Sequence, residues 1–417
     1  MTTTSLKFWN KNYVLLIIGQ IMSLFGNSII RFALSFYLLD ITGSAVIFGS
    51  IMAISIIPMI IFTPFGGLLT DRVNKRNIML FLDIITFGLL LAFGLTLNLG
   101  YEVIQVGVVM SFLAIVQSFY GPAVSAAIPS LQEKENLVAA NAISSQVLMM
   151  SNVLGPILGG LLYAFTGITG LIWIGGSAFF VTAVMDAFMK IPHIKQKFTG
   201  NVFNVVMNDL KQGIGFIVKE QPDISKSLGV LSIVNLLAMV VQVGLPVVLL
   251  VILAVGSQLF GLFGALSAVA GILGGVFVSL TTGKFKFKLD YYALTFGSTM
   301  IVIMGIGFVF SFDNLGIYIF LLACAMLMQF FFPVFNINII SLLQKITPGH
   351  LLGKVMACVS TVSMCAIPLG RFMYGYIFER FEDYLSAIFV VSGILLIVTG
   401  LAFRVLHIRM AESNNIT

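Results

Sequence analysis

The chain has 417 residues, of which 59% are hydrophobic and 9% are charged, whereas soluble domains carry about 25% charged residues. A water-soluble fold of this composition would expose large apolar patches and aggregate, so a soluble enzyme, a nucleic-acid-binding domain and a disordered chain are excluded. At about 20 apolar residues per bilayer crossing, the composition predicts an all-α membrane protein with roughly a dozen spans.

Twelve apolar segments follow one another along the chain. They cover approximately residues 13–38, 45–69, 77–98, 103–127, 138–164, 171–189, 227–253, 258–281, 291–312, 315–340, 355–378 and 385–406. The first is too long for the apolar core of a signal peptide and is expected to be a retained span. All but three of the 22 Lys and Arg residues lie in the two tails and in the even-numbered connections. Basic residues mark the cytoplasmic side, which predicts a multi-pass protein of the bacterial plasma membrane with both termini in the cytoplasm.

The longest polar connection, residues 190–226, separates a predicted N-terminal bundle (1–189) from a C-terminal bundle (227–417), with six helices in each. Residues 119–122 (FYGP) and 330–333 (FFFP) occupy corresponding spans and indicate internal duplication, as in many secondary transporters. Apolar residues recur at helical spacing within the connection, which predicts an amphipathic helix there. Such a helix lies on the inner membrane surface or packs on the ends of the bundles, and the spacing does not distinguish the two.

The loop between the second and third spans carries a motif formed by Gly67, Asp71, Arg72, Asn74 and the basic pair at 75–76. A small residue lets two helices approach, an Asp caps a helix end, and Asn74 is expected to take a left-handed backbone conformation. An ordinary positively charged turn is the alternative. The pattern resembles the motif Gly-x-x-x-Asp-Arg-x-Gly-Arg-Lys of the major facilitator superfamily, with Asn74 in place of Gly. We expect Asp71 to act as a conformational latch.

The fifth span contains Gly155, Pro156, Gly159 and Gly160. Proline kinks a helix and glycines allow close helix packing, so ordinary packing is one interpretation. The spacing also resembles the fifth-helix signature of antiporters in the superfamily. In that fold helices five and eight meet between the halves, so Gly155 and Gly159 are expected to pack there. Matching motifs in chain order extend the resemblance over nearly the whole sequence, to the drug:proton antiporter branch that includes bacterial macrolide-efflux proteins. The resemblance implies the major facilitator fold.

Four ionisable residues, Arg31, Asp83, Asp186 and Arg371, lie inside predicted spans, where charge is costly and usually marks function. Asp83 and Asp186 are close to the cytoplasmic ends of their spans. They are expected either to pair structurally with Arg72 and Arg76 or to take part in coupling.

The two arginines lie in the outer halves of their spans, and either line a cavity or snorkel outward. Gln20, Asn27 and Arg31 share one helical face, which favours a cavity wall. Convergence of Arg31 and Arg371 on one cavity would create an anion site. Gln117 stands where antiporters of the superfamily commonly have an arginine. The expected substrate-binding residues are therefore Gln20, Asn27, Arg31, Gln117 and Arg371.

The resemblance implies a proton-coupled exporter of amphipathic small molecules that works by alternating access, although no carboxylate lies deep in any span. An exporter or flippase of an anionic amphiphile, such as a lysophospholipid or a siderophore, is the alternative. Motifs of membrane-embedded hydrolases and of nucleotide-driven pumps are missing from the sequence, so no enzymatic activity is expected. The expected partners are a small-molecule substrate, protons and the lipid bilayer; no cofactor, metal or nucleic acid is expected, and the chain is expected to be a monomer.

Overall fold

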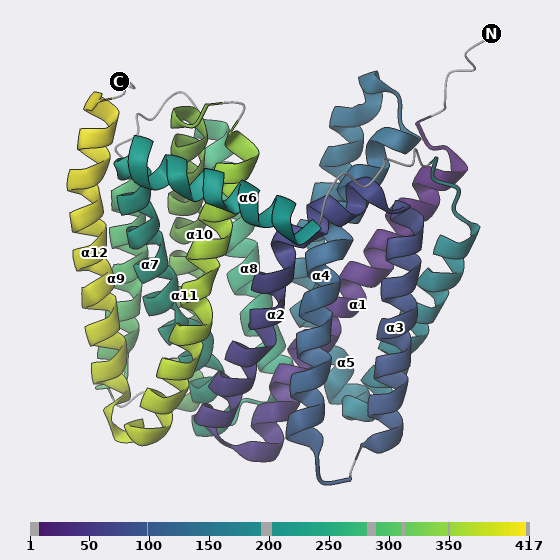
Figure 1. Cartoon of the computed structure of the whole chain (residues 1–417). Coiled ribbons are helices and arrows are strands. Elements are labelled where there is room, and N and C mark those ends of the chain that lie inside the picture. Colours follow the sequence, from purple (N-terminus) through teal and green to yellow (C-terminus); the bar gives the residue numbers. More distant parts are fainter. Residues whose placement is uncertain are drawn as a thin grey trace. The chain divides into compact units, whose positions relative to one another are not determined.

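The computed structural model describes residues 8–97, 99–192, 202–281, 289–310, 313–348 and 351–413. Within these ranges it is built from α-helices (Figure 1). Their bounds are α1 Lys11–Thr42, α2 Ala45–Arg72, α3 Lys75–Thr96, α4 Glu102–Leu131, α5 Leu137–Phe188, α6 Val202–Gly215, α7 Pro222–Val247, α8 Gly256–Thr281, α9 Leu289–Gly307, α10 Asn314–Ile346, α11 Leu352–Arg380 and α12 Leu385–Ser413.

Ten of these helices are long and apolar enough to cross a membrane. One of the ten, Ala139–Phe188, is 50 residues long, about twice what a single crossing needs. The apolar part of α9, Tyr292–Gly307, is shorter. With α5 counted as two crossings and α9 as one, the helices account for the twelve predicted spans. The prediction of an all-helical membrane fold is confirmed.

Helix α5 reverses direction at Gly167, whose φ of 63° is non-helical and is readily adopted only by glycine. The contacts with α1 show the reversal. Successive positions along α1, Gln20 and then Ser28, meet Ser144 and Gly155 in the same order. After Gly167 the order is inverted, because Gly26 of α1 meets Phe179 while the earlier Gly19 meets Asp186. The first limb of α5 therefore runs parallel to α1 and the second runs antiparallel to it.

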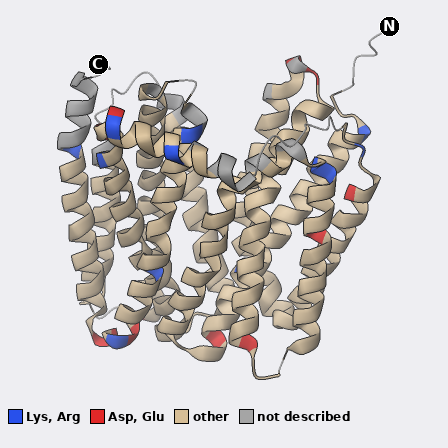
Figure 2. Ribbon diagram, in the orientation of Figure 1, with Lys and Arg blue, Asp and Glu red and all other residues tan. Residues whose placement is uncertain are grey.

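Charged residues are scarce along the helices and concentrate toward their ends (Figure 2). The long uncharged stretches between them match the apolar spans. This distribution is what a bilayer requires, because a charge within the hydrocarbon layer costs roughly 2.5–3.5 kcal/mol on insertion scales.

Two compact units divide the chain. Unit 1 comprises residues 1–38, 54–206 and 257–262, and unit 2 comprises residues 39–53, 207–256 and 263–417. The first helical turns of α2 belong to unit 2, and those of α8 belong to unit 1.

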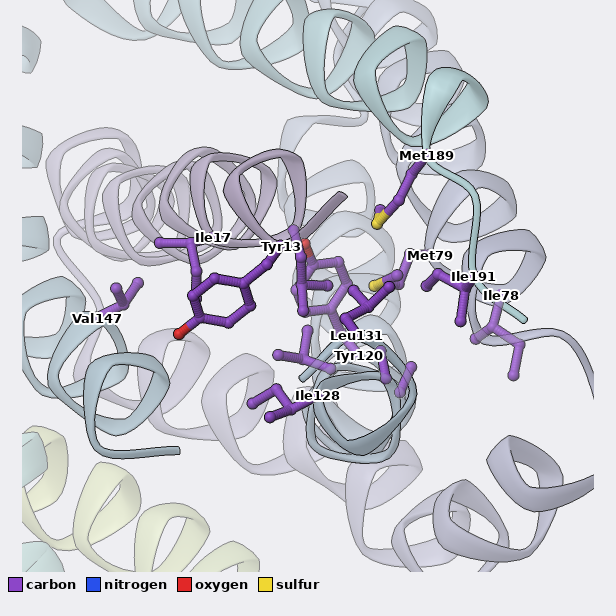
Figure 3. Packing of buried hydrophobic residues seen from close by; sticks show 14 of the residues in the cluster. Tyr13, Ile17, Ile78, Met79, Tyr120, Ile128, Leu131, Val147, Met189 and Ile191 are labelled. Carbon is purple, nitrogen blue, oxygen red and sulfur yellow. The ribbon is translucent and has the colours of Figure 1, made fainter. Parts of the chain in front are cut away.

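The core of unit 1 is an apolar cluster built from α1, α3, α4 and α5. Figure 3 shows Tyr13 and Tyr120 within it, close to Met79, Ile128 and Leu131. The buried Tyr13 hydroxyl donates to the carbonyl oxygen of Ala140 at 3.2 Å, since a phenol needs a partner when it is removed from water.

Unit 2 packs α7, α9, α11 and α12 together, with α10 against α9. Small residues set the spacing of these helices. A Cβ on Gly244 of α7 would lie 2.9 Å from Phe389 of α12, and one on Gly305 of α9 would lie 2.7 Å from Val390. Tyr374 of α11 donates its hydroxyl to Ser392 of α12 at 2.7 Å.

The connection between the predicted bundles contains the amphipathic helix α6, and its C-terminal part packs on α11. Lys354 donates to Oε1 of Gln212 at 2.6 Å, and the Cys358 thiol lies 3.6 Å from the carbonyl oxygen of Leu210. Gly213 permits this approach, because a Cβ there would lie 2.8 Å from the Lys354 carbonyl oxygen. For this part of the helix, the structure shows packing on the end of a bundle.

The expectation of a left-handed backbone at Asn74 is wrong. Asn74 has φ −60° and ψ 119°, and its side chain accepts a hydrogen bond from the backbone N–H of Arg76 at 3.1 Å. It is the N-cap of α3, a position for which asparagine is well suited. The loop motif therefore does not require a glycine here.

Candidate functional site

The cytoplasmic loop motif is only partly within the described residues. The side chains of Asp71 and Arg72, and the packing of Gly67, lie outside them. Gly66, the residue before the motif, makes a close helix approach, since a Cβ there would overlap the Ser118 carbonyl oxygen and lie 3.4 Å from Pro122 of α4; the approach predicted at Gly67 remains a prediction. The latch role of Asp71 remains a prediction.

Arg76, at the start of α3, binds the end of α5. Its Nε donates to the carbonyl oxygen of Asp186 at 3.0 Å, and its Nη2 donates to that of Ala187. The last carbonyls of a helix have no partner within the helix, and a basic side chain satisfies them while complementing the helix dipole. The Arg76 guanidinium also attracts the Asp186 carboxylate electrostatically.

Asp83 on α3 is fully buried and accepts a hydrogen bond from the Ser23 hydroxyl of α1 at 2.9 Å. Asp186, near the end of α5, is 1% exposed. Its Oδ1 would lie 3.5 Å from a Cβ placed on Gly19, one helical turn before Ser23. The two carboxylates interact electrostatically. Tyr120 of α4, also buried, interacts with both carboxylates and with Ser23. We call Ser23, Asp83, Tyr120 and Asp186 the acidic cluster.

The structure therefore brings Asp83 and Asp186 together and adds two residues that the sequence analysis missed. A signal for Ser23 was available, because it lies between Gln20 and Asn27 on the same face of α1. Tyr120 belongs to the duplicated segment 119–122, but that pattern did not mark it as part of a site.

Gln20 and Asn27 join helices within unit 1. The Gln20 amide donates to the Ser144 hydroxyl of α5 at 2.9 Å, and the Asn27 amide donates to the carbonyl oxygen of Leu113 on α4 at 3.2 Å. Both side chains are buried, at 4% and 8% exposure. Gln117 is half-buried on α4. Substrate contacts for the three residues remain predictions.

The two intramembrane arginines have different surroundings. Nη1 of Arg31 is buried and has no hydrogen-bond partner among the described residues. Arg371 donates to the Met52 carbonyl oxygen at 2.8 Å and to Oε1 of Gln242 at 3.2 Å. Arg31 belongs to unit 1 and Arg371 to unit 2, so their convergence on one cavity remains a prediction.

The glycine motif of α5 packs on both α1 and α8. A Cβ on Gly155 would overlap Ser28, and one on Gly159 would lie 3.0 Å from the Ile29 carbonyl oxygen. Gly160 and Pro156 meet α8, because a Cβ on Gly160 would lie 2.8 Å from the Ser257 carbonyl oxygen and one on Gly261 would lie 3.3 Å from the Pro156 carbonyl oxygen. Gly155 and Gly159 were expected to pack between the two halves; the atoms nearest to a Cβ at each belong to α1, and their packing between the halves remains a prediction. Pro156 lies inside the same limb of α5.

The family model described as Major Facilitator Superfamily matches residues 16–288. The chain is 24% identical over 400 residues to Macrolide efflux protein A of Streptococcus pyogenes, covering 93% of this chain and 94% of that protein. It is 22% identical over 365 residues to Multidrug efflux pump Tap of Mycolicibacterium fortuitum, covering 84% and 85%.

Solved structures share the fold at low identity. A peptide transporter POT in complex with alafosfalin superposes with a TM-score of 0.76 and 13% identity, covering 96% of this chain and 95% of that chain. A bacterial homologue of the iron transporter ferroportin in an inward-facing state superposes with a TM-score of 0.68 and 18% identity, covering 94% of this chain and 98% of that chain. Since both identities are low, these likenesses show the fold alone.

Proposed function

The chain belongs to the major facilitator superfamily, and on that premise we propose that it is a proton-coupled exporter of amphipathic small molecules of the macrolide type. It would work by alternating access as a monomer in the bacterial plasma membrane, with both termini in the cytoplasm. The main support for this substrate class is the similarity over 400 residues to Macrolide efflux protein A. The similarity to a multidrug efflux pump supports the same class.

Proton coupling is supported by the acidic cluster in unit 1. Asp83 and Asp186 are ionisable, almost completely buried and close enough to interact. Buried carboxylates of this kind mark proton relays in transporters. The positively charged loop at 71–76 supports the cytoplasmic orientation.

The test is transport by the full chain in proteoliposomes with an imposed pH gradient, using a cationic macrolide and an anionic lysophospholipid as parallel substrates. We expect gradient-dependent movement of the macrolide and none of the lysophospholipid. Empty liposomes provide the baseline. Failure of the macrolide to move under either direction of the gradient would count against the proposal.

Export of an anionic amphiphile is the second candidate, and Arg31 favours it. A buried guanidinium nitrogen without a partner among the described residues is costly, and a carboxylate or phosphate would satisfy it with a charge-assisted hydrogen bond. Under this alternative Arg31→Gln abolishes binding of the lysophospholipid, whereas Arg380→Gln in the predicted outer connection has no effect. If the Arg31 variant binds the lysophospholipid as well as the unmodified protein does, this candidate is excluded.

A further inference from the structure

We propose that the acidic cluster is a binding site for a single proton and that Asp83 carries this proton. The contact between Asp83 and α1 then differs between the protonated and the deprotonated state. The inference deepens the proposed function and rests on it, since it assigns the coupling ion to particular residues. It is argued from three observations: four helices converge at the cluster, both carboxylates are buried, and one oxygen of each carboxylate has no hydrogen-bond partner among the described residues.

The convergence is specific. Ser23 and Gly19 are one turn apart on α1, and they face Asp83 and Asp186 respectively. Positions four residues apart on a helix lie about 5–6 Å from each other, so the two carboxylates approach neighbouring points on α1. Tyr120 closes the cluster from α4. Asp83 is eight residues after the start of α3, about 12 Å along the helix by its rise per residue.

Neither carboxylate is fully satisfied. Oδ2 of Asp83 and Oδ2 of Asp186 are both buried, and neither has a hydrogen-bond partner among the described residues. Two adjacent negative charges in this environment would repel each other, and each would lack part of the hydrogen bonding that compensates for lost hydration. A proton on one of them removes a charge and supplies a donor.

The neighbouring charges indicate which carboxylate is protonated. Arg76 from the first turn of α3 attracts the Asp186 carboxylate and binds the main chain beside it. Among the residues that the structure describes, no cation acts on Asp83 as Arg76 acts on Asp186, and Asp83 receives one hydrogen bond, from Ser23. The other ionisable group at the cluster is Tyr120 of α4, while α1 contributes Ser23 and Gly19, which do not titrate here. The proton therefore resides on Asp83.

Loading and unloading the site changes the contact with α1. A protonated Asp83 donates through its own hydroxyl, and the Ser23 bond is then one between neutral groups. An ionised Asp83 makes a charge-assisted bond to Ser23, which is roughly twice as strong, and it also repels Asp186. The position of α1 relative to α3 and α5 is thus linked to one protonation event.

The experiment is an infrared pH titration of the full chain in lipid, without substrate, following the carbonyl stretch of protonated carboxylic acids. We expect a band from a protonated carboxyl at neutral pH in the unmodified protein. It should be lost in Asp83→Asn and should persist in Asp186→Asn with an altered pH midpoint, because the neighbouring charge is gone. The matched control is Asp383→Asn, which removes an exposed carboxylate and should leave the band unchanged.

Two results would overturn the inference. One is a neutral-pH spectrum without the band. The other is a band that survives Asp83→Asn. If that variant does not fold, a band that neither Asp186→Asn nor Ser23→Ala alters would overturn the inference in the same way.

Addition of NaCl distinguishes a metal-cation site from a proton site. At a cation site the band of protonated carboxyls would be missing, and bands of ionised carboxylates would change when Na⁺ is added. The titration does not depend on transport. If Asp83 titrates but a pH gradient does not drive transport, the proposed coupling is refuted and the assignment of the proton site stands.

Discussion

At the scale of single residues, unit 1 uses its few polar side chains to fix helix ends and helix contacts. Arg76 is the clearest case, because its guanidinium satisfies two carbonyl oxygens at the end of α5. The sequence left open whether the buried acids Asp83 and Asp186 pair with Arg72 and Arg76 or take part in coupling. The structure shows that the hydrogen bonds go to the main chain, a difference that residue type and spacing do not reveal.

We predict that Arg76→Gln destabilises unit 1. Hydrogen bonds from a charged donor contribute about 1.5–3 kcal/mol, and partial exposure of Arg76 reduces this to roughly 1–2 kcal/mol. At about 2–4 °C per kcal/mol for a domain of this size, the midpoint of thermal unfolding in detergent should fall by several degrees. Lys190→Gln, which removes an exposed cation, is the control. Equal midpoints for the two variants would contradict the capping role.

A second residue-scale prediction concerns Gly66. A methyl group there would overlap the Ser118 carbonyl oxygen, and main-chain atoms do not yield easily. Gly66→Ala should therefore lower the free energy of unfolding by about 1–3 kcal/mol, as overpacking does. Gly88→Ala is a matched control, since its Cβ would meet nothing within 4 Å. A Gly66 variant as stable as the Gly88 variant would refute the close approach of α2 and α4.

At the scale of elements, the membrane spans and their boundaries could be predicted from the sequence, because each span must be about 20 apolar residues long. The break between the fifth and sixth spans was expected between residues 164 and 171, and the structure places it at Gly167. The helix partners of the glycine motif were not readable, because a small residue permits close packing without specifying which helix fills the space.

The packing of α6 on α11 gives an element-scale prediction. A methyl group on Gly213 would lie 2.7 Å from the Cys358 sulfur and 2.8 Å from the Lys354 carbonyl oxygen. Gly213→Ala should therefore loosen α6 and raise its rate of cleavage in limited proteolysis several-fold. Gly215→Ala, on the same helix with open space around its Cβ, should be cleaved like the unmodified chain. Equal rates for both variants would show that α6 is not held by this contact.

At the scale of the whole molecule, the sequence predicted a twelve-span fold because composition and charge distribution act on the entire chain. The acidic cluster was only half predicted. Asp83 and Asp186 were marked by charge inside apolar segments, but their convergence with Ser23 and Tyr120 depends on how four helices pack, which hydrophobic periodicity does not encode. Arg31 and Arg371 were marked in the same way, and each unit surrounds its own arginine differently.

The central claim is that movement of an amphipathic substrate out of the cell is exchanged for protons through the acidic cluster. The most direct test adds a macrolide gradient to proteoliposomes that have equal pH on both sides, and follows the internal pH with a trapped indicator. We predict that the macrolide drives protons in the opposite direction in the unmodified protein and in Asp383→Asn, and that Asp83→Asn moves none. Macrolide transport in the unmodified protein without any change of internal pH would contradict the claim.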